Sequence, residues 1–144
     1  MATAWGLVVI ITSVVCWGGQ LWSWFAPRSA ARVGLIEAED QVDRTFWLDA
    51  RGEALWDLCT LWVMPVAGVL LVMGDDWWPY FGLIGGGAYV YFAGRGIVVR
   101  LIMRRNAVRI GNSSSVRIGL IALALWGSIA LITIGAAVTA LEPT

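Results

Sequence analysis

The chain has 144 residues, of which 59% are hydrophobic and 14% are charged, and its formal net charge is zero. Soluble domains carry about 25% charged residues, so the composition predicts a polytopic membrane protein and argues against nucleic acid as a partner. Histidine is absent, which removes the commonest general base and the commonest metal ligand. We therefore expect no enzyme, no catalytic or metal site and no cofactor.

The first predicted membrane span covers residues 5–25. No basic residue precedes this apolar run, and it is longer than the apolar core of a signal peptide, so we expect a retained helix. Trp17, Trp22, Trp24 and Phe25 crowd its second half. Aromatic rings of this kind settle at the lipid headgroups, which places one membrane edge near Phe25.

A charged connector follows, and we predict a short amphipathic interfacial helix over about residues 34–50. On a helical period, Leu35, Val42 and Phe46 share one face, while Glu37 and Asp40 lie on the other. The clustered carboxylates fit either a divalent-cation site or a solvated helix face. The solvated face is the simpler interpretation.

The second predicted span covers residues 54–73 and has Pro65 near its middle, which predicts a kink. Cys16 and Cys59 stand alone on different spans, and the chain has no CxxC motif. We therefore expect both thiols to act as small apolar side chains.

The second and third spans are predicted to form a hairpin, with the third span over residues 78–103. Antiparallel packing around the turn at Gly74–Asp76 places charges at similar depth on the two legs. The predicted interhelical ion pairs are Asp57 with Arg95, Glu53 with Arg100, and Asp49 with Arg104.

Asp75 and Asp76 sit in the turn of this hairpin, beside Trp77, Trp78 and Pro79. Acids here can cap the incoming helix, and the tryptophans can anchor the turn at the interface. The alternative is a pore mouth at which the two acids concentrate cations.

Small residues predict the packing faces of the last two spans, of which the fourth covers residues 116–141. In the lipid interior, helices associate where small side chains allow close approach of their backbones. The predicted packing residues are Gly82, Gly86 and Ala93 on the third span, and Ala124, Ser128 and Gly135 on the fourth.

Arginines predict the orientation of the chain. The loop between the third and fourth spans carries Arg104, Arg105, Arg109 and Arg117, which we expect to contact anionic lipid headgroups. The first connector is also rich in arginine, and the turn near Gly74 has none. By the positive-inside rule both connectors are cytoplasmic and both termini lie outside. Arginine without lysine suggests a bacterial inner membrane.

The predicted architecture is an all-α integral membrane protein, with residues 1–144 forming a single four-helix transmembrane bundle. Because the strongest signals are packing faces and charge pairs, we expect a non-catalytic oligomeric or accessory subunit of a membrane complex. The alternative is a small oligomeric cation channel or passive transporter. A membrane-embedded enzyme is the least favoured of the three.

Overall fold

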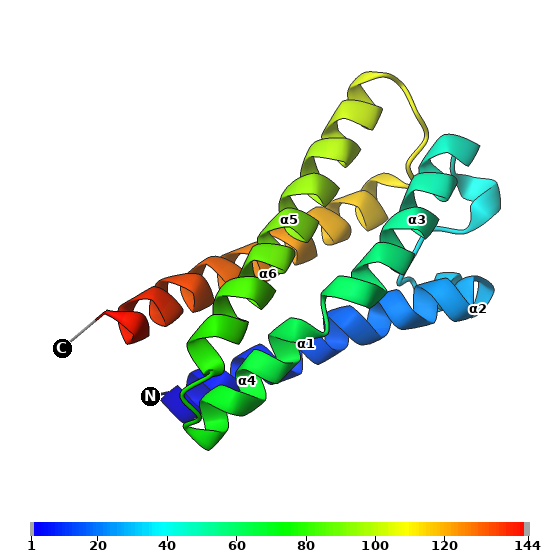
Figure 1. Ribbon diagram of the computed structural model, residues 1–144. Coiled ribbons are helices and arrows are strands. Elements are labelled where there is room, and N and C mark those ends of the chain that lie inside the picture. The colour runs from blue at the N-terminus through cyan, green and yellow to red at the C-terminus, as the bar shows by residue number, and fades with distance from the viewer. Residues whose placement is uncertain (1, 143–144) are drawn as a thin grey trace.

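The computed structural model describes residues 2–142, and all regular secondary structure in this range is helical. In chain order the elements are α1 (Ala2–Phe25), α2 (Pro27–Arg32), the 3-10 helix η1 (Glu39–Gln41), α3 (Arg44–Thr60), α4 (Val63–Met73), α5 (Trp78–Arg105) and α6 (Ser113–Leu141). Helices α1, α3 with α4, α5 and α6 give four segments that are long and apolar enough to cross a membrane. The start of α1, the end of α6 and the α4–α5 turn lie at one end of the molecule (Figure 1).

The connector differs from the predicted helix over residues 34–50. The short helix α2 ends at Arg32, and Gly34 then adopts a left-handed conformation with φ of +78°. This conformation ends helices and is natural for glycine. The chain next forms η1, and α3 starts only at Arg44, with Asp43 in an extended conformation before it. The second half of the predicted interfacial helix is therefore the first part of the second long segment.

The second long segment breaks where Pro65 predicts it. Helix α3 ends at Thr60 and α4 begins at Val63, because Pro65 cannot donate to the carbonyl of Leu61 four residues earlier. Two tryptophans satisfy carbonyls that the break leaves open: Trp17 Nε1 donates to Leu58 O at 2.9 Å, and Trp62 Nε1 donates to Cys59 O at 3.0 Å. The chain bends here, so α3 and α4 point in different directions (Figure 1).

Glycines set how closely the helices approach. A Cβ built on Gly68 of α4 would lie 3.0 Å from the backbone nitrogen of Ile10 in α1. A Cβ on Gly85 of α5 would lie 2.8 Å from the Cα of Met64 in α4. These helices therefore pack at backbone distance, as expected in an apolar environment.

The predicted packing residues of α5 face α6 in the structure, whereas the predicted residues of α6 do not face α5. A Cβ on Gly82 or Gly86 would meet Ala137 or Ile134 of α6, and Ala93 faces Gly127. The three predicted residues of α6 lie on its exposed side instead: Ala124, Ser128 and Gly135. The α6 face that meets α5 is buried at Leu123, Ala130 and Ala137. Both faces of α6 carry small residues at helical spacing. Only the buried face also carries the larger apolar side chains that fill the space beside the α5 glycines.

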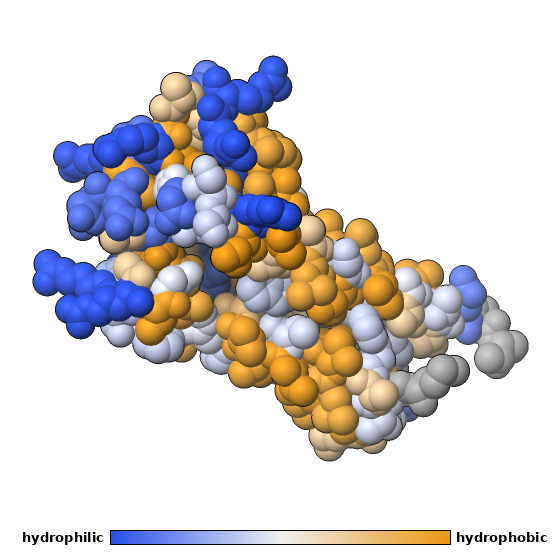
Figure 2. Space-filling view, turned by 180° about the vertical axis from the view of Figure 1, so that it is seen from behind, coloured by the Kyte–Doolittle hydropathy of each residue, from blue (hydrophilic) through white to orange (hydrophobic). Residues whose placement is uncertain are grey.

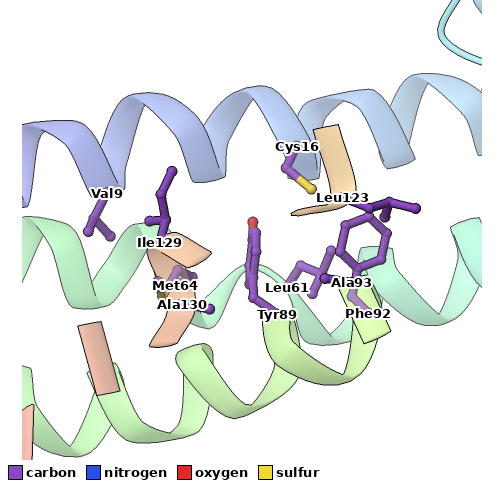
Figure 3. Packing of buried hydrophobic residues seen from close by; sticks show 10 residues of the cluster. All are labelled: Val9, Cys16, Leu61, Met64, Tyr89, Phe92, Ala93, Leu123, Ile129 and Ala130. Atoms are coloured by element: carbon purple, nitrogen blue, oxygen red, sulfur yellow. The ribbon is translucent and has the colours of Figure 1, made fainter. Parts of the chain in front are cut away.

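The centre of the molecule is filled by side chains from all four long segments (Figure 3). Tyr89, Leu61 and Met64 are each at most 1% exposed. The Tyr89 hydroxyl points toward α1 and donates to Ser13 O at 3.0 Å, and Trp126 Nε1 of α6 donates to Thr12 O at 3.1 Å. Polar hydrogens of α5 and α6, fully buried at Tyr89 and partly buried at Trp126, are thus bound to carbonyls of α1.

The outer surface of the long helices is apolar. Ile11, Ile84 and Leu131 are each more than 60% exposed. Hydrophilic side chains gather at the end that carries the α2–α3 and α5–α6 connectors, while hydrophobic side chains dominate the rest of the face in view (Figure 2). We call these parts the charged end and the apolar end. Exposed aliphatic surface of this extent is typical of a protein that contacts lipid.

Candidate functional site

The candidate site lies where α3 and α5 approach each other near the charged end, and it consists of five ionisable side chains. Helix α3 contributes three carboxyl groups at i, i+4 and i+8, which lie on one face of the helix, and α5 contributes two guanidinium groups. We call this set the α3–α5 charge cluster: Asp49, Glu53, Asp57, Arg95 and Arg100.

Arg95 is the centre of the cluster. Its Nη2 lies 2.5 Å from Asp49 Oδ1 and its Nη1 lies 2.8 Å from Glu53 Oε1, so one guanidinium joins two turns of α3. Arg100 Nη1 lies 3.9 Å from Glu53 Oε2 and also donates to Gly96 O at 3.1 Å. The predicted contact of Glu53 with Arg100 is therefore present, at the long end of the salt-bridge range.

The predicted pair of Asp57 with Arg95 is wrong. Asp57 takes no part in the salt bridges formed within residues 2–142. Along the chain the two residues are about equally far from the hairpin turn, since Asp57 lies 16 positions before Met73 and Arg95 lies 17 positions after Trp78. Arginine side chains are long, however, and extend toward the polar end of a span. Arg95 therefore reaches the carboxylates one and two turns beyond Asp57.

Asp57 is left buried without a partner. The residue is 2% exposed, and its Oδ2 has no hydrogen-bond partner among the described side chains and backbone. The charged groups that act on it through space are Glu53, Arg95 and Arg100. An unpaired carboxylate in such a place is costly, so it requires a proton or a bound donor.

A cavity of about 210 Å³ lies between α3 and α5 beside Asp57. Its polar lining comes from the charge cluster, and its apolar lining comes from aromatic rings on both helices. The residues that matter for its chemistry are Glu53, Trp56, Asp57, Tyr91, Phe92 and Arg95. Trp56 and Tyr91 are 60% and 57% exposed, so they stand at its mouth. The sequence did not predict this cavity, because its lining joins residues of α3 and α5 that are far apart in the chain.

The predicted pair of Asp49 with Arg104 is also wrong. Arg104 is exposed near the end of α5 and forms no salt bridge with Asp49, which is bound to Arg95. Arg105 and Arg117 are likewise exposed. Arg104 and Arg109 line a wide surface depression of about 590 Å³ at the start of α6.

A pair that the sequence did not predict joins the two connectors. Asp43 Oδ2 accepts from the Arg109 backbone N–H at 2.7 Å, and Asp43 Oδ1 accepts from Arg109 Nε at 3.1 Å. These hydrogen bonds lower the pKa of Asp43 from its usual value of 3.8. No signal for this pair was available in the sequence, because Asp43 fell inside the predicted helix over residues 34–50 and its partner is 66 residues away.

The connectors also share a small apolar core, which we call the connector core: Val42, Phe46, Ile110 and Val116. Val42 and Phe46 were predicted to share an apolar face, and both are buried; Leu35, from the same predicted face, is exposed. Glu37 lies against Gly111 between the connectors, and burial raises its pKa above the usual 4.5.

Arg51 has a structural role that sequence reasoning missed. Its guanidinium lies over the Trp24 ring, 4.5 Å from the centroid, and Nη1 donates to Ser23 O and Trp24 O. It therefore caps the last carbonyls of α1. In the hairpin turn, Asp75 Oδ1 accepts from Trp77 N at 2.9 Å, which closes a local turn before α5. The N-cap residue of α5, Trp77, has no side-chain cap hydrogen bond, so the predicted capping of this helix by the acids is not seen. Asp76 is exposed.

In the α3–α5 charge cluster, three carboxyls and two guanidiniums leave one negative charge in excess when all five are ionised. Within residues 2–142, no group of three or more His, Cys, Asp or Glu side chains is arranged to hold a metal ion. Comparison with known protein families, with curated proteins and with solved structures finds no match for this chain.

Proposed function

We propose that the protein is a non-catalytic, multi-pass membrane protein whose four long segments form a transmembrane bundle, and that it acts as an oligomeric or accessory subunit of a membrane complex. The observation that carries this proposal is an uncovered glycine face on α5. Gly87 and Gly94 face no atom within 4 Å, whereas an added Cβ on Gly82, Gly85 or Gly86 would contact a neighbouring helix.

Glycine within a helix costs about 1 kcal/mol relative to alanine. The covered glycines of α5 offset this cost, because they allow α4 and α6 to approach. Gly87 and Gly94 stand seven residues apart on one side of the helix and have no such role inside the chain. A helix of another chain that packs on this face would account for them.

A second exposed surface of small residues supports the same proposal. Ala124, Ser128 and Gly135 lie on the side of α6 that faces away from α5. One chain would then have two separate faces for neighbouring helices, as a subunit in a ring or in a larger complex requires.

The test is the mass of the assembly after extraction in a mild detergent, measured by light scattering on a sizing column. We expect a defined oligomer or a co-purifying partner for the wild type, and its loss in the double variant Gly87→Leu with Gly94→Leu, at unchanged melting temperature. Gly119→Leu is the matched control, because Gly119 on α6 also has no atom within 4 Å. A wild type that is monomeric and without partner under every mild condition would refute the subunit proposal.

The proposed location is a bacterial cytoplasmic membrane, with the charged end in the cytoplasm and both termini outside. Arginines cluster at the charged end, and the Gly74–Trp77 turn has none. In a variant without Cys16 and Cys59, a membrane-impermeant thiol reagent applied outside should label a cysteine at position 75 and not one at position 112. The opposite pattern would reverse the orientation.

A cation channel or passive transporter is the second candidate function, and the buried, unpaired Asp57 favours it. Tyr89, Leu61 and Met64 fill the centre of a single chain, so a path for ions would have to run between copies. Purified protein in liposomes should then conduct cations, and Asp57→Asn should reduce the flux. Liposomes without flux at any gradient would remove this candidate.

A further inference from the structure

The cavity between α3 and α5 is lined by a buried carboxyl group that has no hydrogen-bond partner. Asp57 is 2% exposed, its Oδ2 is unpaired within residues 2–142, and the residue lines a cavity of about 210 Å³. Glu53, the other acid of the cavity, already lies 2.8 Å from Arg95. Asp57 is therefore the acid without a partner in a cluster that lacks one positive charge.

The lining indicates which kind of cation fits. Calcium is bound by six to eight oxygen ligands, and magnesium requires six in an octahedron. Here the lining holds Gly52, the paired Glu53 and Arg95, and the three aromatic rings of Trp56, Tyr91 and Phe92. Aromatic faces attract ammonium groups and cover the carbon chains attached to them. The donor set is thus poor for a metal ion and suitable for an organic cation.

The volume and the opening of the cavity limit the size of the ligand and the direction from which it enters. Drug-sized ligands occupy about 300–1,000 Å³, so a volume of about 210 Å³ admits a smaller group. Trp56 and Tyr91 are both more than half exposed on the apolar outer surface of the chain. A ligand would therefore enter from the membrane side, with its charged group leading toward Asp57.

We propose that this cavity binds a protonated primary amine on a small apolar body, whose ammonium group donates to Asp57 and whose carbon chain lies against Trp56 and Tyr91. Bound in this way, the ammonium supplies the positive charge that the α3–α5 charge cluster lacks. The same chemistry is offered by a free alkylamine and by the headgroup of an aminophospholipid. The proposal goes beyond the subunit role, because a single chain contains the whole cavity.

The experiment uses the purified full-length chain in lipid-free detergent and measures its melting temperature as butylammonium chloride is added. Sodium chloride at equal ionic strength is the reference. We expect a saturable increase with butylammonium alone, and an apparent affinity at least about tenfold weaker in Asp57→Asn, because hydrogen bonds between charged groups are the strong ones. Asp76→Asn changes an exposed acid in the hairpin turn and should match the wild type.

Trp56→Leu keeps the proposal testable where Asp57→Asn fails to fold. Trp56 is 60% exposed, so the substitution leaves the interior intact, and loss of the aromatic wall should weaken butylammonium binding severalfold. Nanodiscs identify the source of the amine. Stabilisation by phosphatidylethanolamine relative to phosphatidylglycerol, lost in Asp57→Asn, assigns the site to a lipid headgroup. A response to butylammonium without that lipid effect assigns it to free amines.

Three results would overturn the proposal. The first is the absence of any response to either butylammonium or phosphatidylethanolamine. The second is equal stabilisation by sodium, since this would indicate a site for simple cations. The third is an undiminished response in both Asp57→Asn and Trp56→Leu, which would place the binding elsewhere on the chain.

Discussion

The apolar end and the charged end of the molecule hold their helices together by different means. At the apolar end, α1, α4, α5 and α6 meet at backbone distance through glycines such as Gly68 and Gly85. At the charged end, α3 diverges from α4, and long side chains such as Arg95 connect α3 to α5. Close backbone packing leaves no space between helices, whereas side-chain bridges leave a cavity.

This difference indicates where function can reside in a small membrane protein. Packing through glycines fills the centre with side chains such as Tyr89, so that part is committed to stability. The charged end keeps an unpaired carboxyl and a lined cavity, and such groups are retained for binding more readily than for stability. The substitutions below test this division, from the largest expected effect to the smallest.

The largest effect is expected for Gly85→Ala. The added Cβ would lie 2.8 Å from Met64 Cα and 2.9 Å from Met64 N, and backbone atoms cannot move aside without separating α4 from α5. We expect a loss of about 2–3 kcal/mol of unfolding free energy, at the upper part of the overpacking range. Unfolding in mixed detergent micelles measures it.

Gly87→Ala is the matched control two residues away. A Cβ there meets no atom within 4 Å, and alanine favours the helix over glycine. Its stability should equal or exceed that of the wild type. Equal losses in both variants would show that α5 responds to helix distortion in general and not to close packing with α4.

The next effect concerns the charge cluster, where a double-mutant cycle measures the coupling of Arg95 to each acid. Arg95→Gln and Glu53→Gln should be coupled by about 1–2 kcal/mol, within the range for residues in direct contact. Arg95 and Asp57 should show much weaker coupling, because they form no salt bridge in the structure. Coupling of Arg95 to Asp57 that exceeds its coupling to Glu53 would contradict the observed register.

The contacts of Arg95 show which features of the structure could be predicted from the sequence and which could not. The four apolar segments, the break near Pro65 and the α5 face with Gly82 and Gly86 could all be predicted, because each depends on local periodicity or on the chemistry of one residue. The acids that bind Arg95 could not be predicted in this way. A side chain as long as arginine reaches acids one or two turns away, and the spacing of residues along the two legs does not decide between them.

The connectors were the harder part for a similar reason. A helical period over residues 34–50 was present in the sequence, but Gly34 and Asp43 define a helix end and a helix start within it. The sequence also could not show which face of α6 packs against α5. Ala124 and Ala130 both belong to rows of small residues, and only the packing against α5 shows that the row with Ala130 is the buried one.

A smaller effect is expected at the break between α3 and α4. Trp17→Phe keeps the aromatic ring but removes the donor to Leu58 O, so one carbonyl in an apolar region loses its partner. We expect a loss of about 1 kcal/mol, the usual contribution of a hydrogen bond. Trp22→Phe is the control, since no bond of Trp22 Nε1 is seen in the part of the chain that the structure describes. Identical stability of the two variants would show that the break does not need this donor.

The smallest effect is a pH dependence at the connectors, and it comes from Glu37. Burial raises the pKa of Glu37 above 4.5 in the folded state, so folding favours the protonated form. The stability that this group contributes is fully present below pH 4.5 and is lost as the pH rises through the folded-state pKa. Glu37→Gln mimics the protonated side chain at every pH. The variant should therefore match the wild type near pH 4.5 and be a few tenths of a kcal/mol more stable at neutral pH.

Asp43 provides the opposite sign as a control for this measurement. Hydrogen bonds from Arg109 lower its folded-state pKa below 3.8, so its contribution is present above that pH and is lost only as the pH falls further. Between pH 4.5 and 7.5, Asp43→Asn should shift the stability of the chain by a constant amount, whereas Glu37→Gln should change the slope. A slope that is the same in the wild type and in Glu37→Gln would mean that Glu37 is solvated, and that the contact of Glu37 with Gly111 does not hold the connectors together in solution.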